Sequence, residues 1–225
     1  MLKLFYGGTF DPVHNGHLAI ARAARDELDC NVRLMPAADP PHRAPPGADA
    51  GQRVEMLELA VADQPGLRVD RRELQRDGRS YTIDTLRELR AEFGPATPIA
   101  LLIGADSFIG LPTWREWRAL FDFAHFIVAP RPGSPLDGSS PDGGLPPELT
   151  ALAEGRWTDS PLALKTTPAG RLFLLDQPLY PESASDIRRR IAQNQAWQGL
   201  VAPAVADFIA RHHLYSRPAP GPSPL

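Results

Sequence analysis

The stretch that most constrains the fold lies at the N-terminus, where a short apolar run is followed by two glycines and a helical pattern. The run over residues 2–6 is typical of a buried strand, which we expect Gly7 and Gly8 to end. A helix is predicted over 15–28 and a second strand over 32–35. A chain that begins strand, helix, strand requires a parallel sheet with a right-handed crossover.

The remainder of the chain continues this alternation of helices and strands. It predicts a doubly wound, mainly parallel α/β sheet with a small C-terminal helical part, whose ligand crevice lies beyond the carboxyl ends of the strands. We expect one domain over 1–215 and a proline-rich, disordered tail over 216–225. Helices are predicted over 52–63, 82–93, 114–121, 185–192 and 204–213, strands over 67–70, 99–103, 124–129 and 171–175, and loops or turns over 36–50, 71–79 and 130–147.

Composition argues against several classes of protein. The 225 residues carry a formal net charge of −3, which gives no general reason to expect binding to nucleic acid or to an anionic membrane. The single cysteine, Cys30, can form no internal disulfide, and no apolar stretch is long enough to cross a membrane, so we expect a cytoplasmic protein. Cys30 also lacks a CxxC partner, which disfavours a zinc site. The oligomeric state stays open, with a homo-oligomer among the alternatives.

The glycines and two histidines after the first strand predict an anion site. Gly7 and Gly8 would let the backbone approach a ligand closely, and the following helix directs its free N–H groups and positive end at it. His14 and His17 are three residues apart, so both can face the same anion. Taken alone, a Gly-Gly pair is usually only a turn, and such histidines are more often surface residues. The sequence has neither a GxGxxG fingerprint after this strand nor a GxxxxGK[ST] loop, which excludes those two nucleotide sites.

Further polar residues follow the other predicted strands. The segment from Ser183 to Arg188 opens a late helix and offers hydroxyls, amides and a guanidinium, all suited to phosphate. Local sequence leaves plainer alternatives open: Ser185 as an ordinary N-cap, Asp106 as a turn or cap carboxylate, and Trp114 as a packing residue. The residues that follow strands include His42, Arg43, Gly104, Asp106 and Arg131.

The stretch from Gly7 to His17, GGTFDPVHNGH, resembles the signature of the HxGH nucleotidyltransferase superfamily. With five further motifs it resembles the bacterial nicotinate-nucleotide adenylyltransferases from Lys3 to about Tyr215. The resemblance implies a Rossmann-like nucleotidyltransferase fold and transfer of the adenylyl group of ATP to nicotinate mononucleotide, a step of NAD biosynthesis that releases pyrophosphate. Ser185 stands where the family usually has threonine, and Glu182 where it has an apolar residue. The further motifs are Pro36 to His42, Ser80-Tyr81-Thr82, Gly104-Ala105-Asp106-Ser107 with Pro112-Thr113-Trp114, and Ser183 to Arg188.

The resemblance also implies which residues carry the reaction. Mg²⁺ would come with ATP and water, without a protein metal cage. Trp114 would stack on the pyridine ring, Tyr81 and Thr82 would read its carboxylate, and Arg131 would bind the mononucleotide phosphate. The full sets are, as catalytic residues, His14, His17 and Arg188; for ATP, Gly7, Gly8, Thr9, Phe10, His14, His17, Gly104, Asp106, Ser183, Ser185, Ile187 and Arg188; and for the mononucleotide, Tyr81, Thr82, Trp114, Arg131 and His42.

Two other functions stay open at this stage. One is adenylyl transfer to another acceptor, such as nicotinamide mononucleotide or phosphopantetheine, because the sequence does not show where the donors that would tell a carboxylate from a carboxamide point. The other is a nucleotide-binding regulator without turnover. The joint presence of His14, His17 and Arg188 argues against a regulator, because a protein that only binds nucleotide would not need all the groups that stabilise a transition state.

Overall fold

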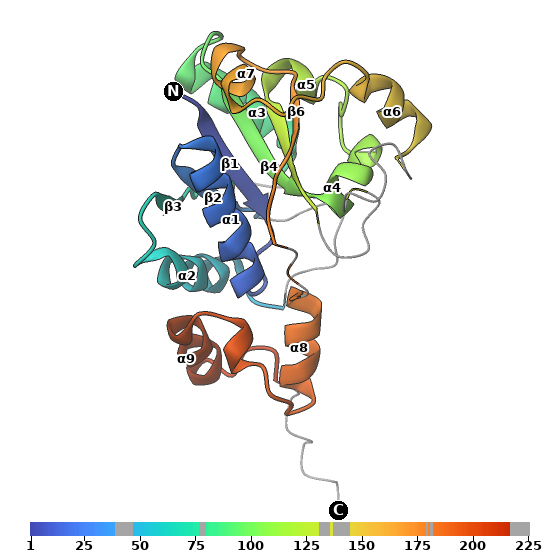
Figure 1. Cartoon of the computed structure of the whole chain (residues 1–225). Helices are drawn as coiled ribbons and strands as arrows, with labels where there is room; N and C mark the ends of the chain where they lie inside the picture. The colour runs from blue at the N-terminus through green and yellow to red at the C-terminus, as the bar shows by residue number, and fades with distance from the viewer. Residues whose placement is uncertain are drawn as a thin grey trace, which may run out of the picture.

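The computed structural model describes residues 1–38, 47–76, 80–130, 136, 145–178, 180 and 182–216. Within these residues, six parallel strands form one sheet with helices on both faces, which confirms the predicted fold class (Figure 1). In sheet order the strands are β3 (Leu67–Val69), β2 (Val32–Pro36), β1 (Lys3–Gly8), β4 (Ile99–Gly104), β5 (His125–Ala129) and β6 (Leu172–Leu174).

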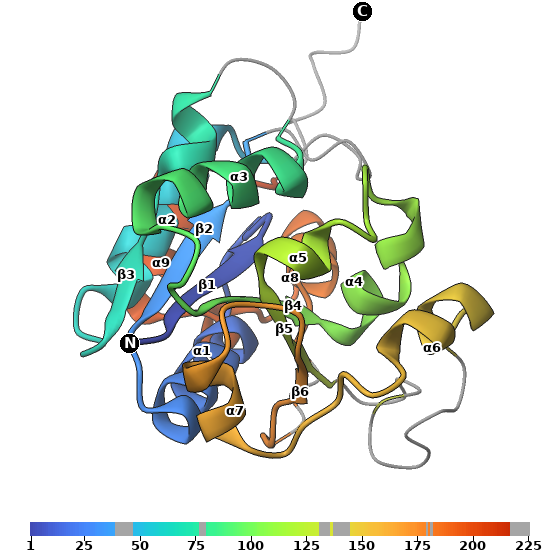
Figure 2. The same ribbon diagram turned by 90° about the horizontal axis from the view of Figure 1, so that it is seen from above.

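Alternating side chains of the strands build a hydrophobic core on each face of the sheet. In β1, Leu4 and Tyr6 belong to one core and Phe5 to the other, as the period of two in a strand requires. Figure 2 shows helices on both sides of the sheet, and Figure 1 shows α8 and α9 together beyond α1 and α2. The first core contains residues of α1 (Asn15–Leu28), α2 (Ala50–Val61), α7 (Pro161–Thr166), α8 (Ala184–Ala192) and α9 (Pro203–Arg211), and the second those of α3 (Thr82–Phe93), α4 (Ala105–Ile109), α5 (Leu120–Phe123) and α6 (Pro147–Ala153).

The sheet opens between β1 and β4, where its strand order reverses direction. These strands pair from Lys3 opposite Ile99 to Tyr6 opposite Leu102, although each continues for two further residues. Beyond that point β1 keeps only β2 as its partner, with Gly7 opposite Met35. The two strands therefore separate at their carboxyl ends, and such a switch point is where open α/β sheets bind ligands.

Three expectations from the sequence need correction. The first strand does not stop before Gly7 and Gly8; it includes them as its last two residues. The helix predicted over 114–121 is wrong: a 3₁₀ turn, η2 (Leu111–Thr113), precedes an extended Trp114, and only α5 is α-helical. Glu116, with a φ of 52°, interrupts any helix through this segment. The sequence also did not predict α4, α6 and α7, nor the 3₁₀ turns η1 (Arg72–Gln75) and η3 (Gln198–Leu200), short elements that depend on tertiary packing.

Candidate active site

The first helix brings both histidines to the switch point. His14 is the N-cap of α1, and its backbone N–H donates to Nδ1 of His17 at 3.2 Å. A ring nitrogen that accepts a hydrogen bond holds no proton, so this geometry leaves the proton of His17 on Nε2. The helix start thus leaves Nε2 as the ring nitrogen of His17 that can donate to a ligand.

Aromatic packing holds the His17 ring in place. Its centroid lies 5.0 Å from that of Phe10 and 3.6 Å from that of His14, and Tyr6 packs edge-on against Phe10. The Phe10 ring also explains the glycine at position 8, because a Cβ there would come within 2.8 Å of it. A few residues of the strand and loop therefore fix the imidazole before any ligand binds.

A cavity of about 370 Å³ lies in front of His14 and His17, and we call it the histidine cavity. Residues from the N-terminal ends of α1, α4 and α8 line it, and the start of a helix favours an anion through its backbone N–H groups and dipole. The first turn of α1 contains no acidic residue, which leaves the positive end of that helix dipole unopposed. The arrangement is suited to an anion. The residues that line it include Gly7, Gly8, Thr9, Phe10, His14, His17, Gly104, Asp106, Ser183, Ser185 and Arg188.

The start of α8 differs in detail from the sequence expectation. The N-cap is Ser183, whose hydroxyl accepts from the Asp186 N–H at 3.1 Å, whereas Ser185 accepts from Nη2 of Arg188 at 3.3 Å. Ile187 does not line the histidine cavity: its side chain is buried in the core and its N–H donates to the Ser183 carbonyl. Glu182, the departure from the family pattern, also lines this cavity.

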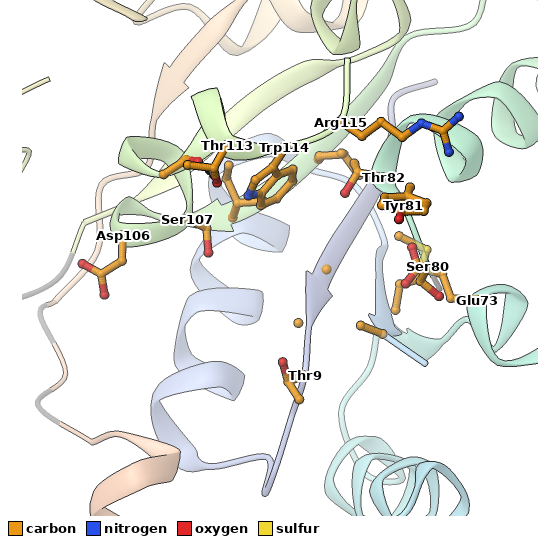
Figure 3. Close-up of a pocket in the computed structure, with 17 residues that line it drawn as sticks. Thr9, Glu73, Ser80, Tyr81, Thr82, Asp106, Ser107, Thr113, Trp114 and Arg115 are labelled. Atoms are coloured by element: carbon orange, nitrogen blue, oxygen red, sulfur yellow. Dashed lines mark hydrogen bonds between the residues drawn. The ribbon is translucent and has the colours of Figure 1, made fainter. Parts of the chain in front are cut away.

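A second cavity of about 350 Å³ lies between η2 and the start of α3, and we call it the tryptophan cavity (Figure 3). Trp114 is half-buried and lines it, whereas Trp117 is buried in the core. Tyr81 is the N-cap of α3 and Thr82 its first residue, so that helix start also faces the space. The tertiary structure thus separates the two tryptophans into one that can stack on a ligand and one that packs.

Glu73 and Ser80 line the tryptophan cavity but were not among the predicted site residues, although Ser80 belongs to the Ser80-Tyr81-Thr82 motif. Glu73 is buried and accepts a hydrogen bond from the Thr85 hydroxyl at 2.7 Å, and burial raises the pKa of its carboxyl. Ser80 is also buried, and Figure 3 shows both beside Tyr81. The sequence placed Glu73 in a charged, turn-like segment, and only the fold turns it inward.

Arg53 in α2 is a further residue that the sequence did not single out. Its side chain is only 1% exposed, and its guanidinium donates to the carbonyls of Thr9, Ala37 and Ala38 at 2.7 to 2.9 Å. Arg53 therefore ties the loop after β1 to the segment after β2. An arginine in an amphipathic helix is expected to be exposed, so nothing in the local pattern indicated this role.

The two cavities share one wall, which places them side by side. That wall consists of the end of β1 and the start of α4, from Gly7 to Thr9 and at Asp106 and Ser107. His42, Arg43 and Arg131 lie outside the described residues. Among the residues that are described, no group of three or more His, Cys, Asp or Glu side chains could hold a metal ion.

Comparison with known proteins agrees with this geometry. A model of the cytidylyltransferase-like family matches residues 5–190. The chain is 59% identical over 224 residues to a protein of Stenotrophomonas maltophilia (strain K279a) and 48% identical over 218 residues to one of Xylella fastidiosa (strain 9a5c). These alignments cover 97% and 95% of this chain and 99% and 96% of the relatives, and both relatives are named "Probable nicotinate-nucleotide adenylyltransferase".

Solved structures show the same fold at low sequence identity. The nicotinic acid mononucleotide adenylyltransferase of Plasmodium falciparum, complexed with NaAD, superposes with a TM-score of 0.69 at 15% identity, over 95% of this chain and 97% of that one. The same enzyme complexed with APC gives a TM-score of 0.67, over 95% and 96%.

Proposed function

The chain belongs to the cytidylyltransferase-like family and, within it, to the nicotinate-nucleotide adenylyltransferases, and from that premise we propose how its two cavities divide the reaction. The enzyme transfers the adenylyl group of ATP to nicotinate mononucleotide and releases nicotinate adenine dinucleotide and pyrophosphate. ATP occupies the histidine cavity, with its phosphates at the three helix N-termini. Nicotinate mononucleotide occupies the tryptophan cavity.

The shared wall is the observation that carries this assignment. Because Gly7 to Thr9 and Asp106 line both cavities, a ligand in each would bring its phosphate to the same place. The phosphate oxygen of the mononucleotide could then approach the α-phosphorus of ATP in line with the departing pyrophosphate. A reaction between two bound ligands depends above all on such alignment.

Transition-state stabilisation falls to donors in the histidine cavity. The nucleophile is already an anion at neutral pH, so no general base is required. In this proposal Nε2–H of His17 donates to the α-phosphate as charge develops on its oxygens, His14 supports it from the adjacent ring, and Arg188 with Ser183 and Ser185 binds the β- and γ-phosphates. These donors are fixed by the fold and need little reorganisation during the reaction.

The tryptophan cavity supplies the acceptor contacts. The Trp114 indole offers a face for the pyridine ring, and the start of α3 at Tyr81 and Thr82 offers hydroxyl and backbone donors for the carboxylate. Asp106, exposed at the start of α4, could accept from the ribose hydroxyls of ATP. Roles for His42 and Arg131 at the mononucleotide remain part of the proposal on the strength of the family resemblance.

We assign Mg²⁺ to ATP itself. The hard oxygen donors of the triphosphate and of water suit Mg²⁺. The metal would neutralise charge on the departing pyrophosphate, while the protein residues bind and orient the two nucleotides.

A pyrophosphate-release assay with ATP and Mg²⁺ tests this function. We expect turnover with nicotinate mononucleotide and a clear preference for it over nicotinamide mononucleotide at equal concentration. His17→Ala, purified in parallel, controls for contaminating activity. A preference for the amide would contradict the substrate assignment, and binding of ATP without turnover of either acceptor would favour a nucleotide-binding regulator.

We also propose that residues 1–215 form a single domain and that the enzyme acts in the cytoplasm on small nucleotides, independently of nucleic acid and membranes. The net charge of −3 supports this, since it provides no general attraction to polyanions. No helix in the described part of the chain is long and apolar enough to cross a membrane. A homo-oligomer is compatible with the proposal, and light scattering would measure it.

A further inference from the structure

Asp11, in the loop after β1, is the meeting point of four segments of the chain. Its side chain is buried, and its carboxylate accepts from the backbone N–H groups of Gly47 at 2.8 Å and Ala48 at 3.1 Å. Nη1 of Arg188 donates to the Asp11 carbonyl at 2.5 Å and lies 3.5 Å from Oδ2. Arg188 is thus held at the histidine cavity by the residue that immediately follows Phe10.

The fourth segment is the C-terminal one, which reaches Asp11 through Tyr215. The Tyr215 hydroxyl donates to Oδ1 of Asp11 at 2.7 Å across 204 positions of sequence. Its ring packs on the backbone of Gly47, where a Cβ would come within 2.9 Å of it. Tyr215 lies outside residues 5–190, the part that the family model matches.

The hydroxyl and the guanidinium share the Asp11 carboxylate: Tyr215 donates to Oδ1, and Arg188 lies 3.5 Å from Oδ2. Burial, then the charge of Asp11 and the hydrogen bond to it, raise the pKa of Tyr215, so the phenol stays a neutral donor at any working pH. It satisfies Oδ1 without adding positive charge, and Arg188 then needs to make only one direct bond to Asp11, through the backbone carbonyl. Nη2 of Arg188 also donates to the Ser185 hydroxyl at 3.3 Å, and the other guanidinium N–H groups, on a side chain that is 35% exposed, face the rim of the histidine cavity.

From this we infer that Tyr215 is a positioning residue for adenylyl transfer: its hydroxyl shares Asp11 with Arg188 and thereby keeps the guanidinium directed at the triphosphate of ATP. The inference rests on the proposed function, since it takes ATP to be the ligand of the histidine cavity. Without the hydroxyl, Oδ1 would keep only the bond from the Ala48 N–H, and the buried carboxylate would then draw Arg188 onto itself and away from the phosphates.

Tyr215→Phe is the direct test, because it removes one oxygen and keeps the ring against Gly47. We expect the KM for ATP and the Kd for α,β-methylene-ATP to rise about tenfold, the scale of one hydrogen bond to a charged group, while the KM for nicotinate mononucleotide changes less than twofold. In an Arg188→Lys background, Tyr215→Phe should add less than twofold to the KM for ATP. Arg211→Ala is the matched control, because it alters the same C-terminal region at an exposed side chain away from Asp11 and should leave both KM values unchanged.

Three results would overturn the inference: an equal rise in both KM values, an effect that adds fully to that of Arg188→Lys, or a lowered melting temperature with unchanged affinity for the ATP analogue. Should Tyr215→Phe fail to fold, Gly47→Ala displaces the ring while leaving the hydroxyl, and unchanged affinity for the analogue in that folded variant would equally refute it. Because α,β-methylene-ATP binding needs no acceptor, a wild-type protein that binds the analogue but releases no pyrophosphate would contradict the proposed function alone.

Discussion

Gly7 and Gly8 are adjacent glycines with different surroundings, so alanine substitutions at the two positions can be compared directly. A Cβ on Gly7 would have no atom within 4 Å, whereas a Cβ on Gly8 would lie 2.8 Å from the Phe10 ring. Gly7 does not have a positive φ, so alanine fits its backbone. The fold therefore requires a glycine at position 8, while position 7 is open on the side of both cavities.

The magnitudes follow from this difference. Gly7→Ala should leave the free energy of unfolding unchanged or raise it by about 0.5–1 kcal/mol, because alanine loses less conformational entropy on folding. Its methyl group would keep a phosphate oxygen from approaching the backbone, and with one hydrogen bond to a charged group lost we expect kcat/KM to fall at least about tenfold. Gly8→Ala should instead destabilise the protein by about 1–3 kcal/mol through overpacking against Phe10.

Urea unfolding and the pyrophosphate-release assay measure the two effects separately. The reasoning predicts a stable, poorly active Gly7→Ala and a destabilised Gly8→Ala. An active Gly7→Ala with unchanged KM for both substrates would show that no ligand approaches this backbone. A destabilised Gly7→Ala beside an unaffected Gly8→Ala would show that the steric argument itself is wrong.

Four further results are expected. His17→Ala should lower kcat about a hundredfold or more at unchanged stability, as loss of a transition-state donor does, and an unchanged kcat would exclude His17 from the mechanism. Trp114→Ala should mainly raise the KM for the mononucleotide, whereas Trp117→Ala should cost about 3–5 kcal/mol of stability in a denaturant titration; the reverse pattern would contradict their assignment. Burial lowers the pKa of His125, so the neutral side chain should contribute its full stabilisation above the unfolded-state pKa of 6.5 and lose it as pH falls toward the folded-state pKa. Unfolding titrations should therefore give a lower free energy of unfolding at pH 5.5 than at pH 7.5, and His125→Gln should reduce that difference. Arg53→Met should lower stability by about 2–5 kcal/mol because three partly buried carbonyls lose a charged donor, and a Tm equal to that of the wild type would refute this.

Local patterns predicted the long elements well. The helices over 15–28 and 82–93 have the predicted bounds. Both have a clear apolar face, and the residue that follows each helix suits the backbone conformation found at a helix end. The prediction was wrong over 114–121, where two tryptophans at helical spacing suggested one helical face. Side-chain identity could not show that Glu116 adopts a positive φ, nor that Trp114 turns toward a cavity while Trp117 turns toward the core.

The sequence by itself determined the class of fold, the glycine and histidine motif at the first strand–helix junction, and the family that this motif and its companions indicate. Each of these patterns is read from residues close together in the chain, whose spacing sets the local geometry. Only the tertiary structure decided that the sheet opens between β1 and β4, that two cavities share the wall at Gly7, and that Arg53, Asp11 and Tyr215 support that wall. The physical reason is that these contacts join residues up to 204 positions apart, and burial and hydrogen bonding across such separations are set by how the layers pack and not by any local pattern.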